Sequence, residues 1–261
     1  MPQHAPKRTK QRRAPRRTGR TTSASPTPKA GVSWWITTIP GRRAILTSSI
    51  AILAGCTAPL YTWDIHTTAT PTSRSFDVTE LTRQPVATLG LVAPAGLLGF
   101  SASLSHALIA ALSEASPSIR GIPAHETVNT FNEQGLVAEY GDLISGFVRS
   151  GILERERLRR IGSALGSRYV LLPGLAEFNQ ALVDKFETAG VKLVKNRVTV
   201  LRLWLQLWDA RMGYLVWEST GEITAASELL TAARTVPLDE IAQKLWLRMI
   251  QDDLLKGKTS G

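Results

Sequence analysis

Side chains able to carry out acid–base or metal chemistry are few and scattered in this chain of 261 residues. The four histidines are His4, His66, His106 and His125. None of them has the short spacing to another histidine that a zinc site uses. His125 and Glu126 are adjacent and could orient one another, but such a pair is more typical of a solvated strand end. We therefore expect no metal ion, no catalytic residue and no enzymatic activity.

Glycines between an expected strand and an expected helix are the second candidate for chemistry. Gly90, Gly96 and Gly99 lie where a phosphate could meet a helix N-terminus. Their spacing matches neither a dinucleotide-binding motif nor a P-loop, and no lysine follows at the required distance. The sequence also contains no GxSxG nucleophile motif. It predicts no bound nucleotide and no non-covalent cofactor.

The only cysteine, Cys56, directly follows an apolar run over Ala44–Gly55. A single thiol excludes an internal disulfide, a cysteine-rich zinc site and a CxxC redox pair. Twelve helical residues span about 18 Å, which is short of the hydrocarbon core of a bilayer at about 30 Å. Arg42 and Arg43 precede the run. A short apolar run behind a basic flank is typical of a secretory signal.

Leu53-Ala54-Gly55-Cys56 resembles the lipobox of bacterial lipoproteins. The resemblance implies cleavage before Cys56 and attachment of a diacylglyceryl group, with further acyl chains such as palmitate, to that residue. Two or more acyl chains anchor a protein stably, at about 0.8 kcal/mol for each buried CH₂. Residue 57 is Thr and not the Asp that signals inner-membrane retention, which favours the periplasmic face of the outer membrane. Alternatively, Cys56 is an ordinary small residue near a signal-peptidase site.

The formal charge of +10 is concentrated at the N-terminus, where residues 1–43 carry eleven basic and no acidic side chains. Residues 1–31 are expected to form a disordered basic tail, and residues 32–55 a signal peptide. Val32 is an alternative start, and export through either the general or the twin-arginine route fits. The rest of the chain is nearly neutral, so no nucleic-acid partner is expected. The alternative keeps the tail as a cytosolic nucleic-acid arm.

Residues after Cys56 divide into a tether and a folded part. Residues 56–84 are rich in Thr, Ser and Pro and are expected to form a flexible tether with a span of roughly 30 Å. Tyr61, Trp63 and Ile65 alternate briefly within it and could dock on the domain or rest at the membrane interface. Residues 85–255 are expected to form a periplasmic domain, followed by a disordered tail over 256–261.

Hydrophobic periodicity predicts nine elements in that domain. Strands are expected at 86–92, 119–128, 169–178 (interrupted at Pro173-Gly174), 197–208 and 214–223, and helices at 98–115, 134–149, 152–165 and 237–255. Residues 184–196 are polar and are expected to be a long connection. Both faces of 197–208 carry apolar residues, which predicts an α/β (α+β) fold with a small mixed sheet covered by helices on both faces.

Two segments, Leu158-Arg-Arg-Ile-Gly-Ser-Ala-Leu-Gly-Ser-Arg-Tyr-Val-Leu171 and Leu203-Trp-Leu-Gln-Leu-Trp-Asp-Ala-Arg-Met-Gly-Tyr-Leu-Val-Trp217, resemble a broad superfamily. It includes the CsgG-type curli-export lipoproteins, the TolB amino-terminal domain and lipoprotein activators of penicillin-binding proteins. The resemblance implies a small α/β domain that binds partners in the cell envelope. It does not by itself supply a function.

The candidate partner surface consists of Trp204, Trp208, Trp217 and Arg202, because exposed Trp and Arg are typical of interface hot spots. The alternative for the tryptophans is core packing against a helix. We expect a membrane-anchored scaffold, or an assembly or activation factor, that contacts a cell-wall synthase, the secretion machinery or copies of itself. One alternative is a subunit of an oligomeric, curli-exporter-like export complex in the outer membrane. Another is an anchored periplasmic hydrolase with an unrecognised site.

Overall fold

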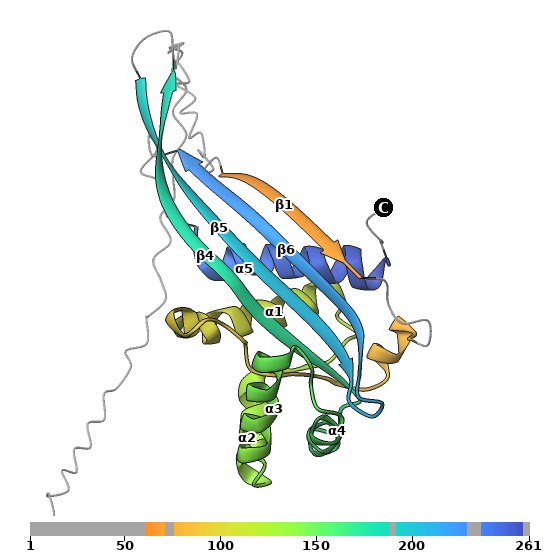
Figure 1. Ribbon diagram of the computed structural model, residues 1–261. Helices are drawn as coiled ribbons and strands as arrows, with labels where there is room; N and C mark the ends of the chain where they lie inside the picture. The colour runs from red at the N-terminus through yellow and green to blue at the C-terminus, as the bar shows by residue number, and fades with distance from the viewer. Residues whose placement is uncertain (1–60, 71–75, 188–191, 229–235, 258–261) are drawn as a thin grey trace, which may run out of the picture. The chain divides into compact units, whose positions relative to one another are not determined.

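A computed structural model describes residues 61–70, 76–187, 192–228 and 236–257 (Figure 1). The strands are β1 (Tyr61–Ala69), β2 (Val86–Thr88), β3 (Gly121–Ile122), β4 (Tyr169–Glu187), β5 (Lys192–Asp209) and β6 (Tyr214–Glu228). The α-helices are α1 (Ser101–Ala115), α2 (Ala124–Glu133), α3 (Val137–Ser150), α4 (Arg155–Ala164) and α5 (Leu238–Arg248). Shorter helical segments are η1 (Val78–Thr82), η2 (Ala95–Phe100) and the π-helical η3 (Met249–Leu255). The basic tail, the signal peptide and Leu53 to Cys56 lie outside the described residues.

All six strands form one mixed sheet in the order β1-β6-β5-β4-β2-β3. β2 is parallel to both β3 and β4, while the pairs β4–β5, β5–β6 and β1–β6 are antiparallel. The parallel pairs are connected through helices, because a chain must cross back before it can add a parallel strand. The antiparallel pair β5–β6 is connected through a tight turn. The predicted mixed α/β fold is confirmed.

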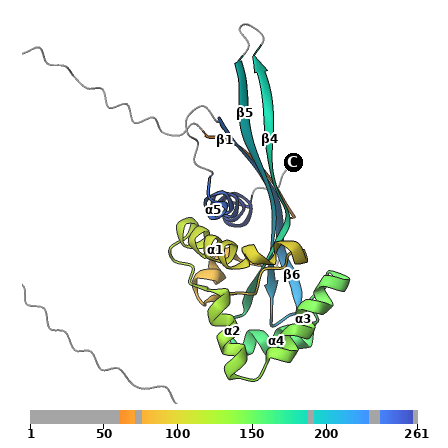
Figure 2. The same ribbon diagram turned by 90° about the vertical axis from the view of Figure 1, so that its left-hand side faces the viewer.

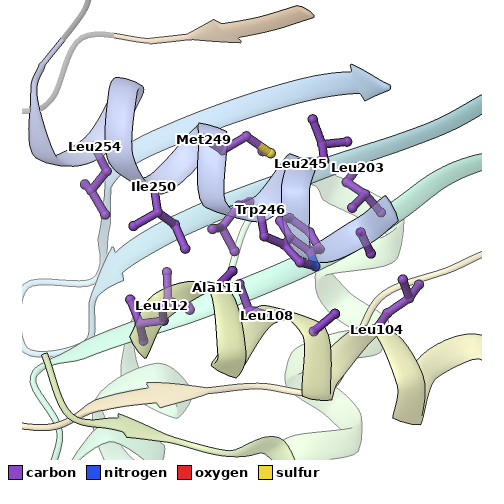
Figure 3. Close-up of a cluster of buried hydrophobic side chains, with 14 of the residues drawn as sticks. Leu104, Leu108, Ala111, Leu112, Leu203, Leu245, Trp246, Met249, Ile250 and Leu254 are labelled. Carbon is purple, nitrogen blue, oxygen red and sulfur yellow. The ribbon is translucent and has the colours of Figure 1, made fainter. Parts of the chain in front are cut away.

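One face of the sheet is covered by α1 and α5 (Figure 3). Leu104, Leu108 and Leu112 recur every four residues and are at most 2% exposed, so they form the buried stripe of α1. Small Ala111 lies in the same stripe, and Trp246 of α5 is fully buried in the same cluster. The result is a two-helix layer packed on Leu203 and its neighbours in β5.

The opposite face is covered by α2, α3 and α4 over one part of the sheet. Phe131, Leu143 and Leu158, one from each helix, join Leu172 and Trp208 in a second buried cluster. Figure 2 shows α1 and α5 on one side of the sheet and α3 on the other. The expectation of helices on both faces is therefore confirmed. These three helices lie near the end of the sheet that carries the β5–β6 turn, where Gly162 of α4 packs against Ala210.

One helical stretch of the described residues, Ala95–Ala115, is long and apolar enough to cross a membrane by length and composition. It consists of η2 and α1. The buried stripe of α1 belongs to the core described above, with Leu104 and Leu108 at 0% exposure. The core helix of a folded domain passes the same test of length and composition, and α1 is such a helix.

The prediction of a flexible tether over 56–84 is wrong for two segments. Tyr61–Ala69 forms β1, which pairs with β6 along its whole length, and Val78–Thr82 forms η1. Trp63 and Ile65 pack against the core on one face, while the alternating polar residues Thr62, Asp64 and His66 are exposed on the other. An edge strand that is buried on one side needs only two or three apolar residues, so its composition looks like that of a linker.

The predicted strand at 119–128 is correct only for Gly121–Ile122. Pro123 caps helix α2, and its φ of −64° already suits the start of a helix. Thr127 and Phe131 are both buried, four residues apart, which is helical spacing. His125 and Glu126 therefore belong to a helix N-terminus and not to a strand end.

The polarity of residues 184–196 suggested a long connection, but 184–187 belong to β4 and 192–196 to β5, while residues 188–191 lie outside the described residues. β4 and β5 stay paired from Leu182↔Arg197 to Glu187↔Lys192 and so form a long hairpin. Backbone hydrogen bonds hold two paired strands whatever their side chains are, so a polar sequence does not exclude strand pairing. The expected interruption at Pro173-Gly174 is a bulge slightly later, between Leu175 and Glu177.

Asp253 of η3 fastens β1 and β6 to the C-terminal helix. Its carboxylate accepts hydrogen bonds from Ser219 Oγ at 2.7 Å and from Thr67 Oγ1 at 3.2 Å, and it is 6% exposed. We expect Asp253→Ala to lower the free energy of unfolding by about 2 kcal/mol, because two hydroxyl groups lose a charged acceptor. Urea titration measures this. The exposed Asp142→Ala is the control, with an expected change below about 0.5 kcal/mol; equal effects of the two variants contradict the fastening role.

Candidate partner-binding surface

The three predicted tryptophans do not form one surface. Trp217 is 1% exposed and belongs to the core under α1 and α5, whereas Trp208 is 5% exposed and belongs to the core under α2, α3 and α4. A register shift next to Trp208 pairs Trp217 with Leu207 and Trp208 with Leu215, which puts the two indoles on opposite faces. The prediction of a partner surface is wrong for Trp208 and Trp217. The alternative, core packing, is confirmed for both.

Trp204 lies at the border of the second core. It is half-buried, and its ring centroid is 5.7 Å from that of Phe147 in α3. The indole also lies directly on Gly174 of β4, where a Cβ atom would be 1.7 Å from Trp204 Cε2. The backbone of β4 and the indole of Trp204 in β5 lie so close together here that only glycine fits at position 174. Trp204 is therefore the residue of β5 at which the contact with α3 ends on this face of the sheet.

Arg202, on the same face of β5, joins three strands. Its Nη1 donates to Glu177 Oε2 of β4 at 2.7 Å, and its Nε donates to Glu222 Oε2 of β6. The hydrogen bond from Arg202 to Glu222 raises the pKa of the guanidinium, with the charge of Glu177 adding to the effect, so Arg202 is permanently charged. Exposed ion pairs of this kind contribute little to stability. The network does hold the charges of Arg202, Glu177 and Glu222 in a fixed arrangement on the surface.

β1 completes this surface at the sheet edge. His66 pairs in register with Glu222, and its Nε2 is 3.1 Å from Asp64 Oδ1. A hollow of about 280 Å³ lies between β1, β6 and β5, with His66, Arg202, Trp204 and Glu222 among its lining residues. We call the group Asp64, His66, Glu177, Arg202, Trp204 and Glu222 the open sheet face.

Of the open sheet face, sequence reasoning found Arg202 and Trp204 and missed the four residues from other strands. A signal was present in β6, where Glu218, Thr220, Glu222 and Thr224 alternate with buried residues. Such alternation predicts a strand with one solvated face. The partners of Arg202 could be found only by knowing which strands flank β5.

A second hollow, of about 380 Å³, lies between α1 and α2 and brings together His106 and His125. Their ring centroids are 6.4 Å apart with nearly perpendicular planes. Glu126 is 4.0 Å from His125 Nε2 but lines a different hollow. Within the ranges that the structure describes, no three His, Cys, Asp or Glu side chains gather as a metal site would require.

Comparisons with known proteins find no matching family model and no matching curated protein. Solved structures that are similar include the PelC dodecamer from Paraburkholderia phytofirmans, at 15% identity and a TM-score of 0.39, with 73% of this chain and 96% of that chain covered. Lipoprotein GNA1162 from Neisseria meningitidis has 15% identity and a TM-score of 0.39, with coverage of 65% and 99%. A PDZ domain protein from Parabacteroides distasonis has 10% identity and a TM-score of 0.35, with coverage of 75% and 37%.

Proposed function

We propose that this chain is a lipid-anchored protein of the cell envelope that works as a scaffold or assembly factor and not as an enzyme. Acyl chains on Cys56 hold it at the periplasmic face of the outer membrane, and the open sheet face binds a partner protein. The observation that carries this proposal is the network of Arg202 with Glu177 and Glu222 on a part of the sheet that no described helix covers.

The chemistry of the open sheet face favours a particular kind of partner. Glu177 and Glu222 contact the single guanidinium of Arg202, and Asp64 contacts His66 on the same face, so the face carries an excess of negative charge. Trp204 adds an aromatic ring at the border, and a half-exposed Trp next to Arg is typical of binding hot spots. A partner with basic side chains around an apolar residue complements this arrangement. The resemblance noted in the sequence favours a cell-wall synthase or a secretion component as that partner.

The test of the binding face is an in-cell photo-crosslink from exposed Thr220, which lines the hollow beside Arg202. We expect a defined envelope protein to be captured, and Arg202→Ala to reduce the capture by about tenfold or more while the melting temperature changes little. Arg160→Ala is the matched control, because Arg160 is similarly exposed and pairs with Glu139 on a helix. No captured protein, or equal loss in both variants, contradicts the proposal.

The anchor has a separate test. We expect Cys56→Ser to move the protein from the membrane fraction to the soluble fraction, because the acyl chains would have no attachment site. Intact mass of the detergent-extracted wild-type protein is expected to show a chain that begins at Cys56 and carries lipid. A full-length, unmodified chain of 261 residues in the membrane fraction excludes the lipoprotein function.

Self-assembly is a second candidate, favoured by the open strand edges at β1 and at the outer part of β4. Among the described strands, β1 has no neighbour on its outer side, and β4 has none beyond Leu175 except β5. The register places Tyr61 level with Leu182 and Ala69 level with Pro173, and β1 is antiparallel to β4. β1 of one copy could therefore extend the sheet of the next at β4, which is a head-to-tail contact that forms a ring where the rotation between copies closes and an open filament where it does not. Native mass spectrometry in detergent distinguishes a ring from a monomer.

A further inference from the structure

A polar hollow of about 390 Å³ lies at the end of the sheet that carries the β5–β6 turn. Figure 1 shows α4 beside this turn. Three arginines line the hollow, each from a different segment: Arg159 of α4, Arg168 just before β4 and Arg211 of the turn. Among the described residues that line it, none is acidic. A guanidinium donates hydrogen bonds in a planar fork, so three of them around one cavity are suited to an anion with several oxygen atoms.

Two of these arginines are positioned by one buried carboxylate. Asp209 is 1% exposed, and its Oδ1 accepts the backbone N–H groups of Arg211 and Met212, both at 2.9 Å. Its Oδ2 accepts a hydrogen bond from Arg168 Nε at 2.9 Å and lies 2.8 Å from Arg168 Nη2. The same side chain therefore shapes the turn that carries Arg211 and holds Arg168 next to it. Asp209 is not among the residues that line the hollow, and these donors occupy its oxygens.

Arg168 is held on two sides and still has donors for a ligand. Its Nη1 donates to Glu80 Oε2 at 2.5 Å, and its guanidinium carbon lies 4.9 Å from the centroid of the Tyr169 ring. The hydrogen bond with Asp209 raises the pKa of Arg168, so the group stays charged. A guanidinium has five N–H groups. The contacts with Asp209 and Glu80 occupy three of them, which leaves one N–H on each terminal nitrogen.

Arg159 and Arg211 bring positive charge that other side chains do not fully neutralise. Arg211 is exposed, and its guanidinium has no ion pair with any residue that the structure describes. Arg159 Nη2 lies 2.9 Å from Glu156 Oε2, but both side chains are more than half exposed. Exposed pairs of this kind are weak, so Arg159 can contact a ligand as well. The hollow therefore presents positive charge to whatever enters it.

The rest of the lining is polar, and the carbonyl groups at the end of α4 are already paired. The carbonyl oxygens of Gly162 and Ser163 accept the N–H groups of Ser167 at 2.9 Å and Gly166 at 3.2 Å. Gln84 and Ser163 contribute polar side chains, and the glycines contribute backbone only. Such a lining suits a body rich in hydroxyl groups and not an acyl chain. The volume is in the range of pockets that hold small organic molecules and exceeds the needs of a bare ion.

We propose that this hollow, which we call the arginine hollow after Arg159, Arg168 and Arg211, binds a phosphate monoester carried on a sugar. The monoester has three unshared oxygens and up to two negative charges, which matches three guanidinium groups better than a carboxylate does. The sugar phosphate is either a free molecule or the headgroup of a glycolipid. None of the residues of the open sheet face lines the arginine hollow, and the inference does not depend on the lipid anchor.

The test is calorimetric titration of the full chain, purified in a non-ionic polyoxyethylene detergent, with glucose 1-phosphate. We expect binding at one site, and Arg211→Gln is expected to weaken it tenfold or more, because a hydrogen-bonded charge contact is lost. Since Arg211 has no ion pair among the described residues, its melting temperature is expected to stay the same. Arg211→Lys keeps the charge without the fork and is expected to be intermediate.

Arg149→Gln is the matched control. Arg149 of α3 is exposed, has no ion pair within the described ranges and does not line the hollow. Its replacement is expected to leave the affinity for glucose 1-phosphate unchanged. Equal losses of affinity in Arg149→Gln and Arg211→Gln would show that the net charge of the protein attracts the ligand, and would overturn the site.

Three further probes separate the parts of the ligand and its source. Inorganic phosphate is expected to bind at least tenfold more weakly than glucose 1-phosphate, and glucose is expected not to bind. Equal affinity for inorganic phosphate overturns the sugar, equal affinity for glucose overturns the phosphate, and no binding of any probe overturns the site. Lipid A, a glycolipid with sugar phosphates, is titrated in the same detergent. Tighter binding of lipid A that is lost in Arg211→Gln assigns the glycolipid source, and weaker binding assigns the free sugar phosphate.

Discussion

Trp217→Ala is expected to lower the free energy of unfolding by about 4 kcal/mol, which is the usual cost of truncating a fully buried Trp. Trp217 is 1% exposed and packs in the core formed by α1, α5 and the sheet. A domain of this size is stable by about 5 to 15 kcal/mol, so the loss is a large fraction of the total. Urea-induced unfolding of the purified protein, followed by circular dichroism, measures it.

Trp204→Ala is the variant with which the stability loss of Trp217→Ala is compared. Trp204 is half-buried at the border of the open sheet face, and its truncation is expected to cost only about 1 kcal/mol. The same substitution should instead reduce crosslinking to a partner. Equal stability losses in Trp204→Ala and Trp217→Ala would show that both indoles are core residues and would remove Trp204 from the binding face.

Gly174→Ala has the second largest expected effect, about 3 kcal/mol of lost stability, because the added methyl group overlaps the indole of Trp204. The ideal Cβ position is 1.7 Å from Cε2 and 2.0 Å from Cζ2 of that ring. The indole must move, and its contact with Phe147 of α3 moves with it. Thermal and urea unfolding report the cost, and tryptophan fluorescence reports the displaced ring.

A double-mutant cycle isolates the steric cause. In a Trp204→Ala background the space above Gly174 is empty, so Gly174→Ala is expected to cost less than about 1 kcal/mol there. Gly141→Ala in α3 is the control for a glycine with open space around it, and it is expected to be neutral or slightly stabilising. If Gly174→Ala costs the same with and without the indole, the explanation by overlap is wrong.

Elements with regular apolar spacing were predictable from the sequence, and elements defined by their neighbours were not. The four-residue spacing of Leu104, Leu108 and Leu112 indicates α1, and the alternating leucines from Leu201 to Leu207 indicate β5. β1 is a strand because β6 pairs with it, since its own sequence contains only Trp63 and Ile65 as packed apolar residues in the interior. The outer part of the β4–β5 hairpin is likewise defined by the pairing of its two strands, which continues to Glu187↔Lys192.

The composition of the open sheet face depends on register, which is why only Arg202 and Trp204 were found. One bulge lies between Leu175 and Glu177 and another lies beside Trp208. Each extra residue exchanges the two faces of the strand beyond it. The first bulge places Glu177 opposite Arg202, and the second turns Trp217 into the core and away from Trp208. Pro173-Gly174 indicates an irregularity near the first bulge but not its position, and the second bulge has no signature in composition or periodicity.

The pairing of β1 with β6 has a mechanical consequence. A force on the chain before Tyr61, directed away from the sheet, pulls along the axis of β1. The nine residue pairs between β1 and β6 then carry the load together, in shear, and do not open one after another like a zipper. The contact of Thr67 with Asp253 transfers part of that load to the C-terminal helix. A pull on the chain before Tyr61 is therefore resisted by the whole β1–β6 pairing at once.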